Sequence, residues 1–421
     1  MRKLLLILLV LPVFIYAQEV SVTEEKKKKE IKHTVNWNSN FLFESNGLDK
    51  SFLNTMLYGG RINNEMKTAW INAGSGNNII HSEISNELSY TYHFKKQNIG
   101  FSFADRSLLN ANFTDDLLRI VFQGNYNYQD KTLFFNNTSI RVDRFQQYKL
   151  SYGTAINKVN IHASVSYLAG NHHLSYILEK GSLYTAPFGT SLAIEYDMSA
   201  FITDTSNFSA FANNGNGIAI DLGADFSIKE YDIQLSITDL GFILWNHSSI
   251  TLATDSNFSF QGIEVEDIFS FNDSVLEANN LKDNALRTNN ASFKSYIPAT
   301  IYMQVSRKTE HTYFKTYTAG IVTKWQPHMD NEPFSFAKIG QGFQESNFSA
   351  LWYLQSAVET KYINLLPNLS YGGYSHNFNV GLGISKGKKR KFILGTQHLE
   401  DLLNGDKAKA VSVYLKIKLN F

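Results

Sequence analysis

The last eleven residues of the chain alternate strictly between apolar and polar side chains. Because successive side chains of a β-strand point to opposite faces, this segment predicts a strand with one wholly apolar face. Eleven residues rise by roughly 36 Å, and a tilt of about 45° reduces that height to roughly 25 Å, the height of a membrane-facing apolar band. A half-buried strand of a soluble β-sandwich is the alternative. The apolar positions are Val411, Val413, Leu415, Ile417, Leu419 and Phe421.

The alternation recurs further inward, over 88–103, 159–167, 218–228 and 380–394. Asp and Lys at the intervening positions would be poor in a soluble core but suit a water-filled lumen, with the apolar residues facing lipid. A final strand that ends on Phe421 resembles the insertion signal of outer-membrane barrels. The sequence therefore predicts an all-β, closed, antiparallel transmembrane β-barrel with an even number of about 14–18 strands.

The connections between the alternating segments differ in length, as expected for short periplasmic turns and longer outer loops. We expect both termini on the periplasmic side. Short turns are predicted near 95–98, 129–131, 156–158, 180–182, 229–232, 307–312 and 386–390. Long connections are predicted near 107–116, 199–215, 246–298, 326–346 and 398–408.

The amino terminus has a basic start, an apolar run over 4–16 and a small residue after it. This pattern predicts a signal peptide over 1–18, cleaved between Ala17 and Gln18, and hence export to the outer membrane. An uncleaved membrane anchor is the alternative. A charged stretch, 24–30, follows, and such stretches are usually solvated. We expect 19–60 to form a periplasmic leader or a lumen plug, and 61–421 to form the barrel.

Composition and motifs exclude several kinds of chemistry. The chain has 39 basic and 38 acidic residues and no cysteine, which argues against nucleic-acid binding, disulfides and Cys-based metal sites. The glycine- and lysine-rich stretch 381–391 lacks the spacing of a phosphate-binding loop. His172 and His173 are adjacent and would point to opposite faces of a strand. The acids of 246–298 lack calcium-loop spacing. We therefore predict no enzyme activity, cofactor or metal.

Four stretches carry a resemblance to a known family. They are "YLAGNH" (167–172), "IDLGADFSIKEYDIQLSITDLGFILW" (220–245), "FSFQGI" (258–263) and "GTQHLEDLL" (395–403). The chain resembles an uncharacterised family of outer-membrane barrels from Bacteroidota. That family is distantly similar to FadL-type long-chain fatty-acid transporters and to barrels associated with type IX secretion. The resemblance implies no catalytic residues.

Three functions remain open from the sequence. The first is a channel or transporter for small apolar or amphipathic molecules, with outer-membrane lipid and a small hydrophobic ligand as partners. This function predicts an apolar pocket in the lumen, partly plugged by 19–60. The second is a scaffold for secretion or surface assembly that binds partners through loops 199–215 and 246–298. The third is a soluble secreted β-protein. Fold analogy alone does not separate the first two.

Overall fold

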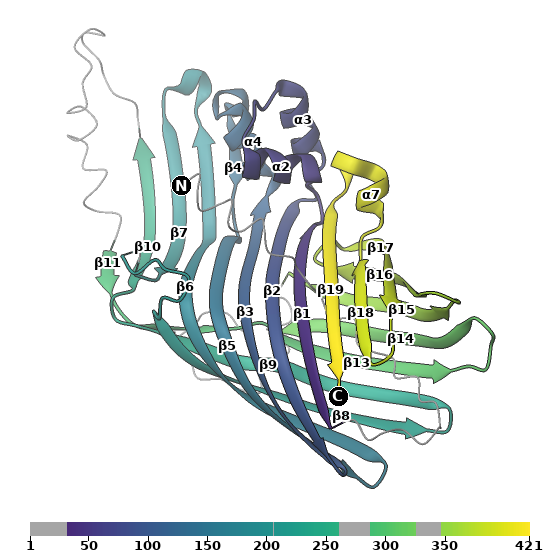
Figure 1. Cartoon of the computed structure of the whole chain (residues 1–421). Helices are drawn as coiled ribbons and strands as arrows, with labels where there is room; N and C mark the ends of the chain where they lie inside the picture. The colour runs from purple at the N-terminus through teal and green to yellow at the C-terminus, as the bar shows by residue number, and fades with distance from the viewer. Residues whose placement is uncertain (1–31, 205, 261–286, 326–346) are drawn as a thin grey trace.

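The structure is a computed structural model, and it describes residues 32–204, 206–260, 287–325 and 347–421 (Figure 1). Its strands belong to one antiparallel sheet that closes on itself. No helix in these described ranges is long and apolar enough to cross a membrane.

Fourteen strands form the closed ring, as the even range of 14–18 predicted. Closure comes from the first strand, which pairs with its sequence neighbour β2 and with the last strand, β19. In ring order the strands are β1 (His33–Ser45), β2 (Asn77–Phe94), β3 (Gln97–Thr114), β5 (Thr138–Ile156), β6 (Val159–Thr185), β8 (Gly215–Ile228), β9 (Tyr231–Trp245), β13 (Ala299–Lys308), β14 (Phe314–Trp325), β15 (Ser349–Glu359), β16 (Asn364–Gly373), β17 (Asn377–Lys386), β18 (Arg390–Thr396) and β19 (Ala410–Asn420).

The remaining described strands extend the wall beyond the ring. β6 is 27 residues long, and its second half pairs with β4 (Lys131–Phe134) and β7 (Leu192–Ile202). β7 pairs in turn with β10 (Ile250–Phe260), which pairs with β11 (Arg287–Asn290). β12 (Phe293–Tyr296) pairs with β9 in line with β13. The sheet therefore rises higher at β6, β7 and β10 than elsewhere (Figure 1).

Short and long connections separate to opposite ends of the barrel, as predicted. We call one end of the barrel the turn end. It carries the first residue of β1, the last residue of β19 and six short hairpin turns, at 95–96, 157–158, 229–230, 309–313, 360–363 and 387–389. The opposite end, the loop end, carries α2 (Lys50–Tyr58), α3 (Asn64–Asn72), α4 (Asp115–Gln123), η1 (Tyr126–Tyr128), η2 (Pro187–Gly189), α7 (Glu400–Asn404) and η5 (Gly405–Lys407).

Three predicted connections are wrong. The polar run at 180–182 lies inside β6, because the strand bulges between Leu178 and Lys180 and continues past β7. The turn at 129–131 leads into β4 at the loop end, and 107–116 is mostly the end of β3. A polar stretch with a glycine is typical of a turn. Between the apolar belt and the loop end, however, a strand of a barrel can be polar on both faces.

The expected boundary at residue 61 is also wrong. β1 lies within the segment that we predicted as leader or plug, yet it belongs to the wall, and the barrel begins at His33. The helices α2 and α3 follow it and cap the loop end, where Leu48, Trp70 and Leu118 form a small buried core. The predicted signal peptide and residues 19–31 lie outside the described residues.

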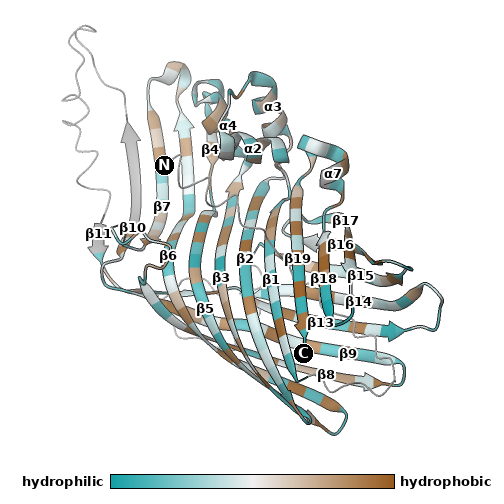
Figure 2. Cartoon of the chain, viewed as in Figure 1, coloured by the Kyte–Doolittle hydropathy of each residue, from teal (hydrophilic) through white to brown (hydrophobic). Residues whose placement is uncertain are grey.

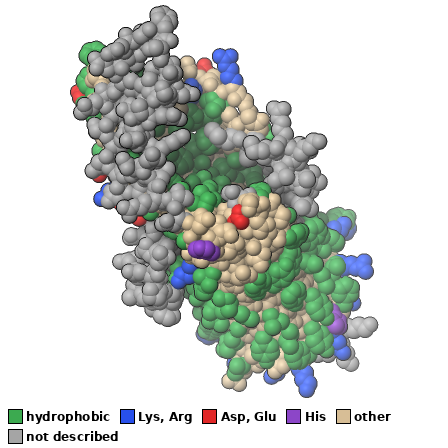
Figure 3. Space-filling view, turned by 90° about the vertical axis from the view of Figure 1, so that its left-hand side faces the viewer, with side chains coloured by type: hydrophobic (Ala, Val, Ile, Leu, Met, Phe, Trp, Pro, Cys, Tyr) green, Lys and Arg blue, Asp and Glu red, His purple; other side chains and the backbone are tan. Residues whose placement is uncertain are grey.

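The alternation places a belt of apolar side chains on the outside. Residues that pair directly across strands share a face, and the apolar face of β19 continues on β1, with Val413 opposite Phe41 and Ile417 opposite Trp37. Leu150 and Trp352, on β5 and β15, are 56% and 59% exposed. Figure 2 shows the alternation along single strands, and Figure 3 shows hydrophobic side chains covering the lower wall. The predicted apolar face of the final strand is therefore on the outer surface.

Candidate functional site

Part of the inner face of the barrel is polar and surrounds a cavity of about 140 Å³. It lies between the side chains of β1–β3, β9, β13–β16 and β19. Amides, hydroxyls and charged groups outnumber the aliphatic residues in its lining. This cavity is therefore polar, and it differs from the apolar pocket that the sequence predicted for the lumen. Its lining includes Asn40, Glu44, Glu83, Arg106, Asp239, Thr300, Tyr302, Gln304, Lys324, Tyr353, Gln355, Asn368, Ser370, Tyr374, Gln397 and Tyr414.

An ion pair crosses the whole lumen beside this cavity. Lys324 Nζ on β14 lies 3.3 Å from Glu83 Oε2 on β2. Seven steps separate these strands in either direction around the ring, so the two side chains come from opposite walls. Arg106 continues the connection, 3.5 Å from Glu83 and 2.7 Å from Asp239 on β9. We call Glu83, Lys324, Arg106 and Asp239 the charge bridge.

A bulge in the backbone of β9 orients the Asp239 carboxylate toward the charge bridge. Asp239 has φ +60°, in the left-handed region, at a bulge of β9 opposite β8. Its backbone N–H donates to the Asp221 carboxylate at 2.8 Å, and its own carboxylate accepts from Gln147 at 2.9 Å. Lys149 Nζ lies 2.5 Å from Asp221 and 3.8 Å from Asp239. Every charge in this chain of contacts therefore has an opposite partner, as buried ions require.

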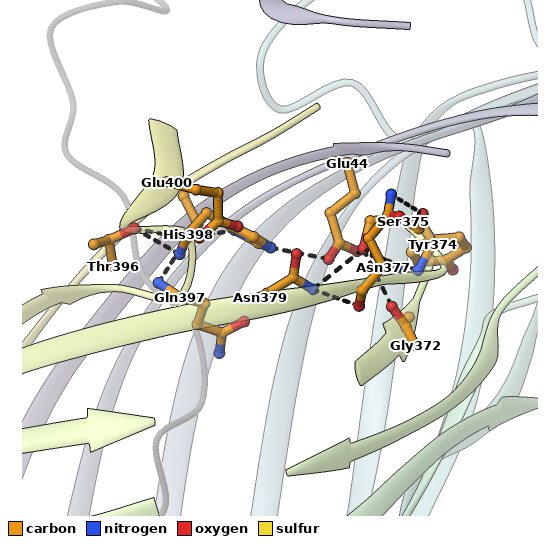
Figure 4. Close-up of polar contacts among 12 residues, drawn as sticks. Glu44, Gly372, Tyr374, Ser375, Asn377, Asn379, Thr396, Gln397, His398 and Glu400 are labelled. Carbon is orange, nitrogen blue, oxygen red and sulfur yellow. Dashed lines mark hydrogen bonds and ion pairs between the residues drawn. The ribbon is translucent and has the colours of Figure 1, made fainter. Parts of the chain in front are cut away.

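A second polar cluster joins β1 to the connections after β16 and β18 (Figure 4). Glu44 Oε1 lies 3.2 Å from His398 Nε2, and the other Glu44 oxygen accepts the Tyr374 N–H at 3.3 Å. The His81 imidazole stacks on the Tyr374 ring, with ring centroids 3.7 Å apart. Burial raises the pKa of the Tyr374 hydroxyl, and Lys324 lies 5.3 Å from the centre of the same ring.

The order Ser412–His398–Glu44 invites comparison with a catalytic triad. His398 Nδ1 lies 2.9 Å from Ser412 Oγ. However, Ser412 Oγ accepts the Gln397 N–H at 2.8 Å and is buried, and Ser412 is absent from the cavity lining. A nucleophile must reach its substrate. The cluster therefore serves to fix Glu44 at the cavity edge rather than to attack a substrate.

His172 and His173 have separate surroundings, as the sequence suggested. His173 points inward and lies 2.7 Å from Asp143, between the rings of Trp245 and Phe293. His172 stacks on Phe208 with ring centroids 4.2 Å apart. Among the described residues there is no group of three or more His, Cys, Asp or Glu side chains that could hold a metal. The stretch 381–391 forms β17, a turn and β18.

The predicted partner loops are only partly free. Residues 199–202 belong to β7, and 206–214 lie against the outer wall, where Asn171 donates to the Ala212 carbonyl at 2.6 Å and Gln146 to the Ala210 carbonyl at 3.1 Å. Of the loop 246–298, residues 261–286 lie outside the described residues.

An apolar groove of about 450 Å³ lies in the belt on the other side of the same wall. Its lining includes the small residues Ala319 and Gly320 of β14 among larger side chains. Gln304, Tyr353 and Ser370 belong to the linings of both the groove and the lumen cavity. The outward-facing lining comprises Met303, Val305, Ala319, Ile321, Trp352, Leu354, Leu369, Tyr371 and Phe378.

Tyr353 separates the groove from the cavity. A Cβ atom on Gly320 would lie 2.4 Å from Tyr353 Cζ, so the phenol ring lies against the glycine backbone. Its hydroxyl donates to Gln304 Oε1 at 2.7 Å, and Gln304 donates to Gln234 at 2.7 Å. Sequence reasoning missed the charge bridge and Tyr353, although the polar parity of their strands was visible.

Solved structures of transporters are similar to this chain at very low sequence identity. The Pseudomonas putida toluene transporter TodX is 9% identical, with a TM-score of 0.42 over 93% of this chain and 90% of that chain. The Ralstonia pickettii toluene transporter TbuX is 8% identical, with a TM-score of 0.41 over 93% and 90%. A Pseudomonas aeruginosa FadL homologue is 10% identical, with a TM-score of 0.42 over 92% and 89%.

No curated protein sequence matches the chain. Residues 33–396, which run from the first residue of β1 to the last residue of β18, match a family described as a family of unknown function (DUF5723). The match covers most of the barrel and the whole charge bridge, whereas His398 of the second polar cluster lies beyond its end. The chain belongs to the DUF5723 family.

Proposed function

We propose that this protein is an outer-membrane channel or transporter for small amphipathic molecules. The apolar belt supports a position in a lipid bilayer, and the predicted signal peptide and final strand support the outer membrane. The lumen cavity offers hydroxyls, amides and paired charges to a polar group, whereas the groove offers an apolar surface. An amphipathic ligand has both kinds of group, which a wholly apolar or wholly polar ligand lacks.

The observation that carries this proposal is the wall at β13–β16. There, Gln304, Tyr353 and Ser370 belong to the linings of the polar cavity and of the apolar groove at once. A ligand that places its polar group in the cavity and its alkyl part in the groove would satisfy both surfaces. Tyr353 is the side chain that such a ligand would displace.

Trp352 provides a direct test, because it lines the groove. The protein in nanodiscs is titrated with a brominated alkyl maltoside, and quenching of the tryptophan fluorescence is measured. We expect saturable quenching that is lost in Trp352→Phe and weakened several-fold in Ala319→Phe, whose larger side chain would fill the groove from the outer face of β14. Trp37→Phe, on the far wall, is the matched control. Non-saturable quenching that is equal in all variants would contradict the proposal.

The location and the insertion signal remain predictions with simple tests. Membrane fractionation should recover the protein with the outer membrane even after a high-salt wash. Deletion of Phe421, the last residue of the apolar face, should reduce assembly of the heat-modifiable barrel. Recovery of the chain as a freely soluble protein would reject the outer-membrane location.

The scaffold function remains an alternative without a specific observation in its favour. The similarity to barrels associated with type IX secretion remains a prediction. The binding of a secretion or surface partner also remains a prediction. A partner recovered in stoichiometric amounts from mild detergent would support them.

A further inference from the structure

The hairpin turns at the turn end of the barrel are unusually basic. Each of the six carries a lysine within it or beside it. The six turn segments 93–99, 155–160, 227–233, 305–316, 358–364 and 385–392 contain thirteen Lys and Arg but four Asp and Glu, although the whole chain is nearly balanced, with 39 basic and 38 acidic residues. We infer that this ring of cations, the basic rim, binds the anionic head groups of phospholipids in the adjoining leaflet.

Acidic side chains of the same turns neutralise part of the basic rim. Arg307 lies 3.0 Å from Glu230, and Lys308 lies 2.8 Å from Asp232. Lys315 lies 4.0 Å from Glu359. These contacts engage three of the four acids, leaving Glu310. Lysines elsewhere on the basic rim, such as Lys95, Lys158 and Lys229, form no ion pair with the described residues and need counter-ions from outside the chain.

The basic rim begins where the apolar belt ends. Ile156 and Ile228 are each 53% exposed and stand one or two residues from Lys158 and Lys229. Phe392, 47% exposed, follows the basic run 388–391. Lys361 Nζ lies 5.4 Å from the ring centre of its neighbour, Tyr362. Figure 3 shows Lys and Arg side chains along the margin of the hydrophobic surface.

This arrangement fits a lipid head group better than a dissolved anion. A side chain at the end of the belt can lay its aliphatic part along the apolar surface and hold its ammonium at the depth of the phosphates. Lys and Arg near an anionic membrane surface are attracted to it, and the attraction falls off within about a Debye length, so it weakens in high salt. The cations are distributed around the whole circumference of the barrel, where a ring of lipids would also lie.

The inference rests on the proposed position in a membrane. The experiment distinguishes a failure of lipid binding by the basic rim from a failure of that membrane position. The protein is reconstituted in phosphatidylcholine vesicles, and electron spin resonance measures how strongly spin-labelled phosphatidylglycerol is enriched at the protein over spin-labelled phosphatidylcholine. Lys95→Gln/Lys158→Gln/Lys361→Gln removes three cations from three separate turns. The matched control, Lys131→Gln/Lys180→Gln/Lys407→Gln, removes three lysines at the loop end.

We expect an enrichment of at least about two-fold in the wild type, which 1 M salt abolishes because surface charges are then screened. The rim variant should lose much of it and the loop-end control should keep it. Equal binding of the two lipids by the wild type, or an enrichment that the rim variant leaves unchanged, would overturn the inference. A wild type with no immobilised lipid at all would instead reject the position in the membrane. Heat-modifiability on a gel confirms that each variant is folded.

Discussion

The two sides of the lumen differ in how they are filled. Between β5, β6, β8 and β9 a cluster of apolar side chains fills part of the inner face, and Trp245 is 1% exposed among Phe145, Leu168, Ile243 and Phe293. Along β13–β16 and β1 the inner face is polar and surrounds the cavity. A closed barrel of this size therefore need not be an open pore. Apolar packing fills one side, whereas the other leaves the cavity in which we propose that the polar group of a ligand binds.

Glycines make the packed side possible. A Cβ atom on Gly170 would lie 2.6 Å from the Trp245 ring, and one on Gly215 would lie 2.7 Å from it. The indole nitrogen donates to Ser295 Oγ at 2.8 Å. Gly170 and Trp245 occur in "YLAGNH" and in the long stretch that ends at 245. These stretches therefore encode the packed side, and the long one also carries Asp239 of the charge bridge.

The largest effect should come from removing the centre of the packed side. We expect Trp245→Ala to destabilise the barrel by about 3–5 kcal/mol, because it leaves a cavity and an unpartnered Ser295 hydroxyl. Trp352→Ala, on the lipid-facing surface, should cost far less. The unfolding free energy in urea, measured by heat-modifiability on a gel, compares the two. Similar losses for both variants would show that the apolar packing is not concentrated on one side.

The next effect concerns the charge bridge, which spans the lumen beside the cavity. Glu83→Gln/Lys324→Gln removes both charges of the pair that joins opposite walls, and we expect the conductance in planar bilayers to rise several-fold. Removing only Lys324 should also destabilise the fold by on the order of 3 kcal/mol, since Glu83 then loses a close partner. Unchanged conductance in the double variant would show that another part of the chain closes the lumen.

The smallest effect is expected at the turn end. Arg307 and Glu230 form an ion pair in which both side chains are about half exposed. Replacing both by Gln should change the unfolding free energy by less than about 1 kcal/mol and leave the conductance unchanged. This variant is also the control for the charge bridge, because it removes the same two charges from the surface. A change in conductance would show that charges at the turn end also control the passage of ions.

The sequence predicted which residues share a face better than it predicted which residues meet. Period-two alternation identified the apolar faces of β8 and β19 and the alternation of short and long connections. It could not pair Glu83 with Lys324, because 241 residues separate them and only ring closure brings their strands opposite each other.

β1 was assigned to the wrong segment for a related reason. Its inward face carries Thr34, Asn36, Asn38 and Asn40, and a strand so polar resembles a leader until its partner β19 is known. The helices α2 and α3 then lie in what looked like a continuous amino-terminal segment. The groove at Gly320 gave no signal, since a glycine in a strand does not reveal that a neighbouring tyrosine lies against it.

The most direct test of the account is a cysteine scan of β15, which a chain without native cysteine allows. Single cysteines at Trp352, Tyr353, Leu354 and Gln355 are labelled with a small fluorophore in bilayers, and quenching is compared between a brominated lipid and a water-soluble ion. We predict that labels at 352 and 354 are quenched by the lipid and labels at 353 and 355 by the ion. Quenching that does not alternate along the strand would contradict a wall with lipid on one side and a wet lumen on the other.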